Sequence, residues 1–129
     1  MGVALPDAAR RLLDRNTYFV LTTIQPDGSP HSSVVWARRD GDDILVSTLR
    51  GRRKELNLRR DPRVSLLAID PDNPFAYVEV RGSVTVTEQG GRELINELSL
   101  AYTGKQYPQE PPQDVRVVIR VTAAKVISH

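Results

Sequence analysis

The chain contains no cysteine among its 129 residues. This absence excludes disulfides, thiolate nucleophiles, cysteine-bound zinc and iron–sulfur clusters. No apolar run approaches the length of a membrane-spanning helix, and the first residues lack the apolar core of a signal peptide. We therefore expect a protein of the reducing cytoplasm.

Several catalytic signatures are also missing. The sequence has no G-x-S-x-G, P-loop or G-x-G-x-x-G pattern, so a hydrolase, a nucleoside triphosphatase and a Rossmann-type enzyme all lack support. The two histidines, His31 and His129, lie far apart in the sequence, and no cluster of carboxylates accompanies them. We therefore expect no metal site.

The composition is that of an ordinary globular protein, with 40% hydrophobic and 26% charged residues. A chain of this length forms one domain around one core, so we assign residues 1–129 to a single domain. The net charge is only +2, yet basic residues gather between positions 50 and 63. A local cluster of this kind favours a small anionic ligand over a long polyanion.

The basic segment follows a strand-like apolar run at residues 44–46 and two hydroxyls, Ser47 and Thr48, and it turns at Gly51. A strand that brings hydroxyls, backbone N–H groups and cations to the start of a helix is suited to holding a phosphate. The spacing places Arg50 and Lys54 four residues apart, as it does Arg53 and Asn57, so each pair is predicted to share a helix face. The alternative is a solvated helix face stabilised by a pair between Glu55 and Arg59.

Alternation of apolar and polar residues predicts a mainly β protein. The longest alternating run, residues 78–87, has Gly82 in its middle and is expected to bend or bulge there. We predict a six-stranded antiparallel split β-barrel. Its strands are expected at residues 18–24, 31–38, 44–48, 63–69, 78–87 and 116–127. Helices are expected at residues 5–15, in the basic segment and at 88–103, and Gly104 is expected to cap the last of them.

Two motifs in this order resemble a known family. Residues 54–64 read Lys-x-x-Asn-Leu-x-x-Asp-Pro-x-Val, and residues 27–30 form an Asp-Gly-x-Pro turn ahead of Val34-Val35-Trp36. The chain resembles the flavin/deazaflavin oxidoreductases of the pyridoxamine-phosphate-oxidase-like split β-barrel superfamily. More narrowly, it is similar to the small actinobacterial members that use coenzyme F420.

This resemblance implies a homodimer with two equivalent cofactor sites at the subunit interface. It also implies which residues bind the cofactor. The residues expected to contact the ring are Ser33, Val34, Val35 and Trp36. Those expected to contact the phosphate are Ser47, Thr48, Leu49, Arg53 and Lys54, with Arg50 in the same basic run. Asn57 follows on the helix, and Tyr77 is expected to reach across from the partner. Trp36, the only tryptophan, is interpreted equally as core packing or as cofactor wall.

The resemblance implies an F420-dependent oxidoreductase that transfers a hydride to an electron-poor bond or ring of a small molecule. No catalytic side chain is identified. The alternatives are an FMN-binding oxidoreductase of the same fold and a protein that binds F420 without turnover. A barrel for single-stranded nucleic acid is a third, but aromatics are only 5% of the chain and none interleaves with the arginines. The C-terminal segment lacks a further basic set for pyridoxamine phosphate, so vitamin B6 oxidation is not expected.

Overall fold

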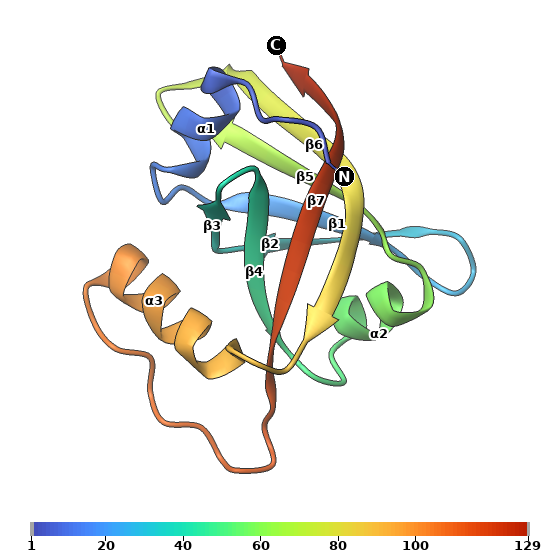
Figure 1. The fold of residues 1–129 in the computed structure, drawn as a ribbon, viewed down its shortest axis with the longest axis vertical. Coiled ribbons are helices and arrows are strands. Elements are labelled where there is room, and N and C mark those ends of the chain that lie inside the picture. Colours follow the sequence, from blue (N-terminus) through green and yellow to red (C-terminus); the bar gives the residue numbers. More distant parts are fainter. Residues whose placement is uncertain (1, 129) are drawn as a thin grey trace.

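The computed structural model describes residues 2–128 as a curled antiparallel sheet with three short helices (Figure 1). His129, one of the two histidines, lies outside the described residues. The strands are β1 (Phe19–Ile24), β2 (Pro30–Val35), β3 (Ala37–Asp40), β4 (Asp43–Leu49), β5 (Arg63–Asp70), β6 (Asn73–Thr87) and β7 (Arg116–Ser128), and the helices are α1 (Asp7–Leu13), α2 (Arg53–Arg60) and α3 (Gly91–Thr103). None of the helices within residues 2–128 has the length and apolar character needed to span a membrane.

The strands lie in the order β2-β1-β5-β6-β7-β4-β3, and every neighbouring pair is antiparallel. The two outermost strands, β2 and β3, are consecutive in the chain and are joined at Trp36. The chain therefore passes from one edge of the sheet to the other at this residue. Because the sheet is curled, the two edges face each other and form a half-barrel (Figure 1).

The sheet has seven strands where six were predicted, because the expected strand at residues 31–38 is broken. Val35 pairs with Phe19 of β1, whereas Ala37 pairs with Val46 of β4, so Trp36 belongs to neither ladder. The backbone N–H of Ala37 donates to the Tyr102 hydroxyl at 3.2 Å. In a continuous strand this N–H group would donate to a neighbouring strand, whereas here it donates to a side chain of α3.

The core lies inside the curled sheet and follows the predicted alternation. Along β7, for example, Val117, Ile119 and Val121 are fully buried while their neighbours are partly exposed. Gly82 marks a break in register between β6 and β7, which confirms the predicted bulge. A side chain at Gly82 would overlap the backbone carbonyl of Thr122, so only glycine allows this close approach.

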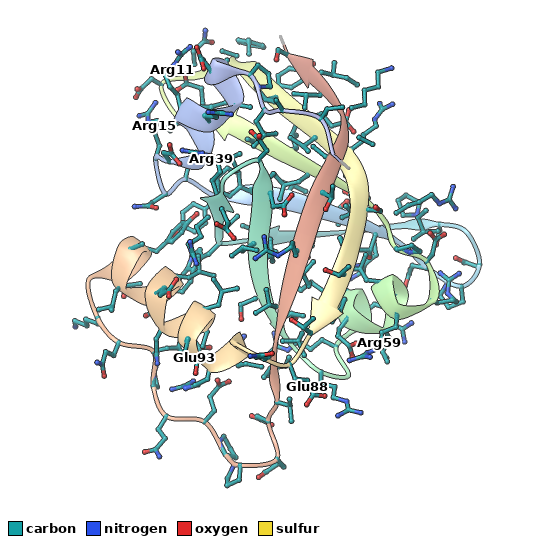
Figure 2. All side chains as sticks on the ribbon, viewed as in Figure 1. Arg11, Arg15, Arg39, Arg59, Glu88 and Glu93 are labelled. Carbon is teal, nitrogen blue, oxygen red and sulfur yellow. The ribbon has the colours of Figure 1, made fainter. Side chains whose placement is uncertain are left out.

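Helix α2 is stabilised by its own buried carboxylate. Glu55 Oε1 accepts a hydrogen bond from the backbone N–H of Gly51 at 2.7 Å, while its other oxygen pairs with Arg59, which is half-exposed on α2 (Figure 2). The expected Glu55–Arg59 pair is therefore present. Arg53 and Asn57 also share a face, with Arg53 Nη1 3.4 Å from Asn57 Oδ1.

The predicted pairing of Arg50 with Lys54 on one helix face is wrong, because α2 begins only at Arg53. Arg50 lies in the turn before the helix, where its guanidinium forms an ion pair with Glu88 at 2.8 Å.

Helix α3 ends at Thr103 and is followed by Gly104, whose φ of 77° confirms the predicted left-handed cap. It begins at Gly91, three residues later than predicted, after a second left-handed glycine at Gly90. A side chain at Gly91 would overlap the carbonyl of Arg116, so the start of α3 lies directly against the start of β7.

We expect Gly91→Ala to destabilise the protein by about 1–3 kcal/mol, because the new methyl group must displace backbone in a packed region. Chemical denaturation measures this change. Gln89→Ala, at an exposed position beside it, is the control and should alter stability by less than about 0.5 kcal/mol. Equal stability of Gly91→Ala and the wild type would show that α3 does not depend on this contact.

Candidate functional site

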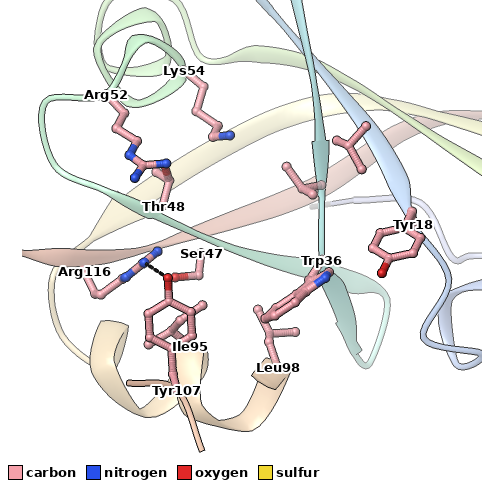
Figure 3. A pocket seen from close by; sticks show the side chains of 12 residues that line it. Tyr18, Trp36, Ser47, Thr48, Arg52, Lys54, Ile95, Leu98, Tyr107 and Arg116 are labelled. Carbon is pink, nitrogen blue, oxygen red and sulfur yellow. Dashed lines mark hydrogen bonds between the residues drawn. The ribbon is translucent and has the colours of Figure 1, made fainter. Parts of the chain in front are cut away.

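A cavity of about 310 Å³ lies where the two edges of the sheet face each other (Figure 3). Strands β2 and β4, helices α2 and α3, the start of β7 and the loop before it all contribute to its wall. The lining residues are Tyr18, Val34, Val35, Trp36, Ser47, Thr48, Arg52, Lys54, Ile95, Leu98, Tyr107 and Arg116. Arg52 and Arg116 lie toward one side of this view, and Trp36 and Tyr18 lie toward the other.

The polar side of the cavity is built on the end of β4. The ladder between β3 and β4 ends at Ala37 and Val46, so residues 47–49 are paired with β7 alone. In this stretch the hydroxyls Ser47 Oγ and Thr48 Oγ1 are buried and make no hydrogen bond within the described chain. Buried hydroxyls are nearly always paired in folded proteins, so two adjacent exceptions at a cavity mark a place for a ligand.

Three cations surround these hydroxyls: Arg52, Lys54 and Arg116. Lys54 Nζ lies 3.1 Å from Ser33 Oγ, and burial together with the charges of Arg52 and Arg116 lowers the pKa of this amine. Within residues 2–128, no carboxylate forms an ion pair with Arg52 or Lys54. The same residues contain no group of three or more potential metal-binding side chains. The site therefore attracts anions.

The opposite side of the cavity is apolar. Trp36 stacks on Tyr102 with ring centroids 5.1 Å apart and an interplanar angle of 15°. Tyr102 is fixed in turn, because its hydroxyl donates to the Thr17 carbonyl at 2.6 Å. The ring packs on α3, as the core interpretation predicts, and it also lines the cavity. Its contact with a cofactor stays a prediction.

The loop of residues 105–115, which we call the strap, is fastened beside the cavity by Glu110. This carboxylate accepts from Arg92 Nη1 at 2.6 Å and from Arg116 Nε at 3.0 Å. Arg116 Nη2 also donates to the Tyr107 hydroxyl at 3.0 Å (Figure 3). The hydrogen bond and charge of Arg116, joined by the charge of Arg92, hold the pKa of Glu110 below its usual range.

The structure brings many of the predicted site residues to one place. Those at the cavity are Val34, Val35, Trp36, Ser47, Thr48 and Lys54, and Ser33 adjoins it through Lys54. Leu49 does not line the cavity, and Arg50 is engaged by Glu88. Arg53 is exposed, and Asn57 is buried with Nδ2 donating to Thr23 Oγ1 at 3.0 Å.

Tyr77 lies opposite Ile69 in the β5–β6 ladder and is not among the cavity residues of this chain. Its reach into a partner's site stays a prediction.

Several lining residues were not assigned from the sequence, and they come from several parts of the fold. They are Tyr18, Arg52, Ile95, Leu98, Tyr107 and Arg116. Arg52 lies in the basic segment, so the clustering of charge in the sequence could have identified it as a site residue. Arg116 sits in an alternating strand 62 positions from Lys54 (116 − 54), so only the fold reveals that both face one cavity.

Comparison with known proteins assigns the chain to a family. The pyridoxamine 5'-phosphate oxidase family model matches residues 5–129, so the chain belongs to this family. It is similar to the structure of an F420 reductase, with 32% identity, a TM-score of 0.84, and coverage of 95% of this chain and 98% of that one. A conserved hypothetical protein from Mycobacterium tuberculosis is 27% identical with a TM-score of 0.74, covering 98% of this chain and 86% of that one.

A putative pyridoxamine 5'-phosphate oxidase from Listeria innocua, 24% identical with a TM-score of 0.76, shares the fold; the match covers 95% of each chain.

The strap should be acid-sensitive. We expect Glu110→Gln to lower stability by about 1 kcal/mol near neutral pH, because two arginines lose their carboxylate. The folded pKa of Glu110 lies below its ordinary value of 4.5, so this contribution is present above about pH 4.5 and is lost as the pH falls through the lowered pKa. Melting temperatures of both proteins between neutral and acid pH test this, and a difference independent of pH would contradict it.

Proposed function

We propose that this protein is an F420-dependent oxidoreductase. Membership of the pyridoxamine 5'-phosphate oxidase family and the 32% identity with an F420 reductase support a general flavin- or deazaflavin-type oxidoreductase function. The main support for placing the cofactor in this cavity is the pair of buried hydroxyls, Ser47 Oγ and Thr48 Oγ1, which have no hydrogen-bond partner within residues 2–128 and lie among three cations.

The residues present fit such a cofactor. F420 combines a flat tricyclic ring with a phosphodiester and a polyglutamate tail, and the cavity has an apolar side and a cationic side. Val34, Val35 and Trp36 would hold the ring, while Ser47, Thr48, Arg52, Lys54 and Arg116 would hold the phosphate. When bound and reduced, F420 supplies a hydride. The protein's own residues orient the ring and exclude water from it.

We further propose that the active form is a homodimer. A volume of about 310 Å³ is at the lower end for small-molecule pockets, so one chain offers only part of the space a large cofactor needs. Val34 and Tyr18, at the cavity, are 65% and 62% exposed. A second chain covering them would enlarge the wall of the site and remove exposed apolar surface.

FMN is the second candidate, because its ring and phosphate satisfy the same two sides of the cavity. Two exposed arginines at the start of α2, Arg52 and Arg53, favour F420, whose tail carries additional carboxylates. Arg53, close to the cavity in sequence, is exposed and has no carboxylate partner in the described chain. A non-catalytic F420-binding protein would use the same contacts and would differ only in showing no turnover with any acceptor.

The first test is a parallel titration with F420 and FMN, followed by quenching of Trp36, the only tryptophan. We expect saturable binding that is tighter for F420. Lys54→Ala should weaken binding roughly 10- to 150-fold, the equivalent of one charge-assisted contact, with little change in the melting temperature of the free protein. Lys125→Ala, at an exposed position, is the control.

Tighter FMN binding would move the protein to the flavin branch, and binding of neither would remove the basis for the proposed function. Unchanged affinity in Lys54→Ala would remove this residue from the phosphate site.

A second test asks whether Glu110 acts on the site by charge or by geometry. Its carboxylate repels an anionic cofactor, so charge alone predicts that Glu110→Gln binds more tightly. Its contacts also fix the orientation of Arg116, so geometry predicts weaker binding. We expect binding to weaken several-fold. Glu93→Gln, which removes the same charge from an exposed position on α3, is the control, and tighter binding by Glu110→Gln alone would overturn the geometric role.

A further inference from the structure

Lys54 differs from the other two lysines of the chain. Lys105 and Lys125 are exposed, whereas Lys54 is partly buried in the wall of the cavity. Its amine has one hydrogen-bond partner in the described chain, the neutral hydroxyl of Ser33. No carboxylate in residues 2–128 forms an ion pair with it, so nothing there stabilises the ammonium form by an opposite charge.

The surroundings also favour the free amine, which is the nucleophilic form. Burial has the largest effect on the pKa of Lys54 and lowers it, and the positive charges of Arg52 and Arg116 lower it further. A larger fraction of this amine is therefore unprotonated at neutral pH than of an ordinary surface lysine. Lysines made nucleophilic by burial and by neighbouring cations are known as covalent catalysts and acceptors.

The same cavity offers a place for a phosphate beside this amine. Ser47 Oγ and Thr48 Oγ1 are buried donors that have no partner in the described part of the chain, and Arg52 and Arg116 line the wall with them. Arg116 is oriented by Glu110 through Nε, which leaves Nη1 without a partner in the described chain. Figure 3 shows Lys54, in the first turn of α2, and Arg52, just before the helix, projecting toward the space above Thr48.

We propose that Lys54 is a site of direct acylation by acyl phosphates. The phosphate of the donor binds Ser47, Thr48, Arg52 and Arg116, and the free amine of Lys54 attacks the adjacent acyl carbon. A C–N bond forms and the C–O bond to phosphate breaks. Inorganic phosphate leaves with the bonding electron pair, its charge held by the two arginines, and the amine loses one proton to solvent. No oxidant, reductant or metal takes part.

The product is a neutral amide in place of a cation, so acylation would weaken any anion held at this site. If the proposed cofactor binds here, acylation of Lys54 lowers its affinity, and this consequence rests on the proposed function. The acylation itself rests only on the anion-binding cavity. The two ideas therefore fail separately, because the chemistry can be followed without any cofactor.

The test is to incubate the purified full chain with acetyl phosphate and to follow each lysine by peptide mass spectrometry. We expect Lys54 to be acetylated at least roughly tenfold faster than Lys105 and Lys125, the gain given by about one charge-assisted phosphate contact. Inorganic phosphate at high concentration should protect Lys54 and leave the two exposed lysines unaffected. Acetic anhydride, which has no phosphate to anchor, should show a much smaller preference for Lys54.

Variants separate anchoring from intrinsic reactivity. Ser47→Ala and Thr48→Val each remove one unpartnered hydroxyl, and both should slow acetylation of Lys54 by acetyl phosphate but not by acetic anhydride. Melting temperatures establish that each variant is folded, and two variants guard against the loss of one. The proposal is overturned if Lys54 reacts no faster than Lys105 and Lys125, or if phosphate gives no protection. An equal preference for Lys54 with both reagents would also overturn the anchored mechanism.

Discussion

The site depends on one interruption of the sheet, at Trp36. There the chain leaves one edge of the sheet and joins the opposite edge. Trp36 belongs to neither the β1–β2 nor the β3–β4 ladder, and Tyr102 takes the neighbouring N–H of Ala37. Since β3 starts only after this break, the end of β4 has no strand on that side. Two hydroxyls remain there without partners among residues 2–128, and the Trp36 ring lines the cavity that they border. A continuous strand would have closed this opening with backbone hydrogen bonds.

The electrostatics of the molecule follow from which cations are neutralised. Most of the arginines form ion pairs with carboxylates, as Arg120 does with Asp40 and Asp43. Arg52 and Lys54 have no such partner within residues 2–128 and face the same cavity. A protein with a net charge of only +2 can therefore present a strongly positive site, because its charges are unevenly paired and not because they are numerous.

Local patterns in the sequence predicted much of the fold, and distant contacts account for what they missed. Alternation located the strands, and the glycines at 82 and 104 have the bulge and the cap expected of them. The break at Trp36 depends on Tyr102, which no local pattern around residue 36 contains. The same holds for the cavity. Ser47, Thr48 and Lys54 lie close in sequence to the helix start, and the sequence pattern singled them out. Arg116 and Tyr107 reach the cavity only through the packing of α3 and the strap. The shared helix face predicted for Arg50 and Lys54 was wrong because the Gly51 turn delays the start of α2 to Arg53.

Arg116 explains why a carboxylate can lie beside a site that attracts anions. Glu110 accepts from Nε of Arg116, on the side of the guanidinium away from Nη1. The carboxylate and a bound anion would therefore use different N–H groups of the same planar guanidinium. The carboxylate lowers the positive potential, but it also fixes the plane in which the remaining donors point. Arg92 holds Glu110 from α3, and the start of α3 is held against β7 by the close approach at Gly91. The orientation of one cavity arginine is therefore set by a helix, a strand and the strap together, which makes this side of the site preorganised and not merely charged.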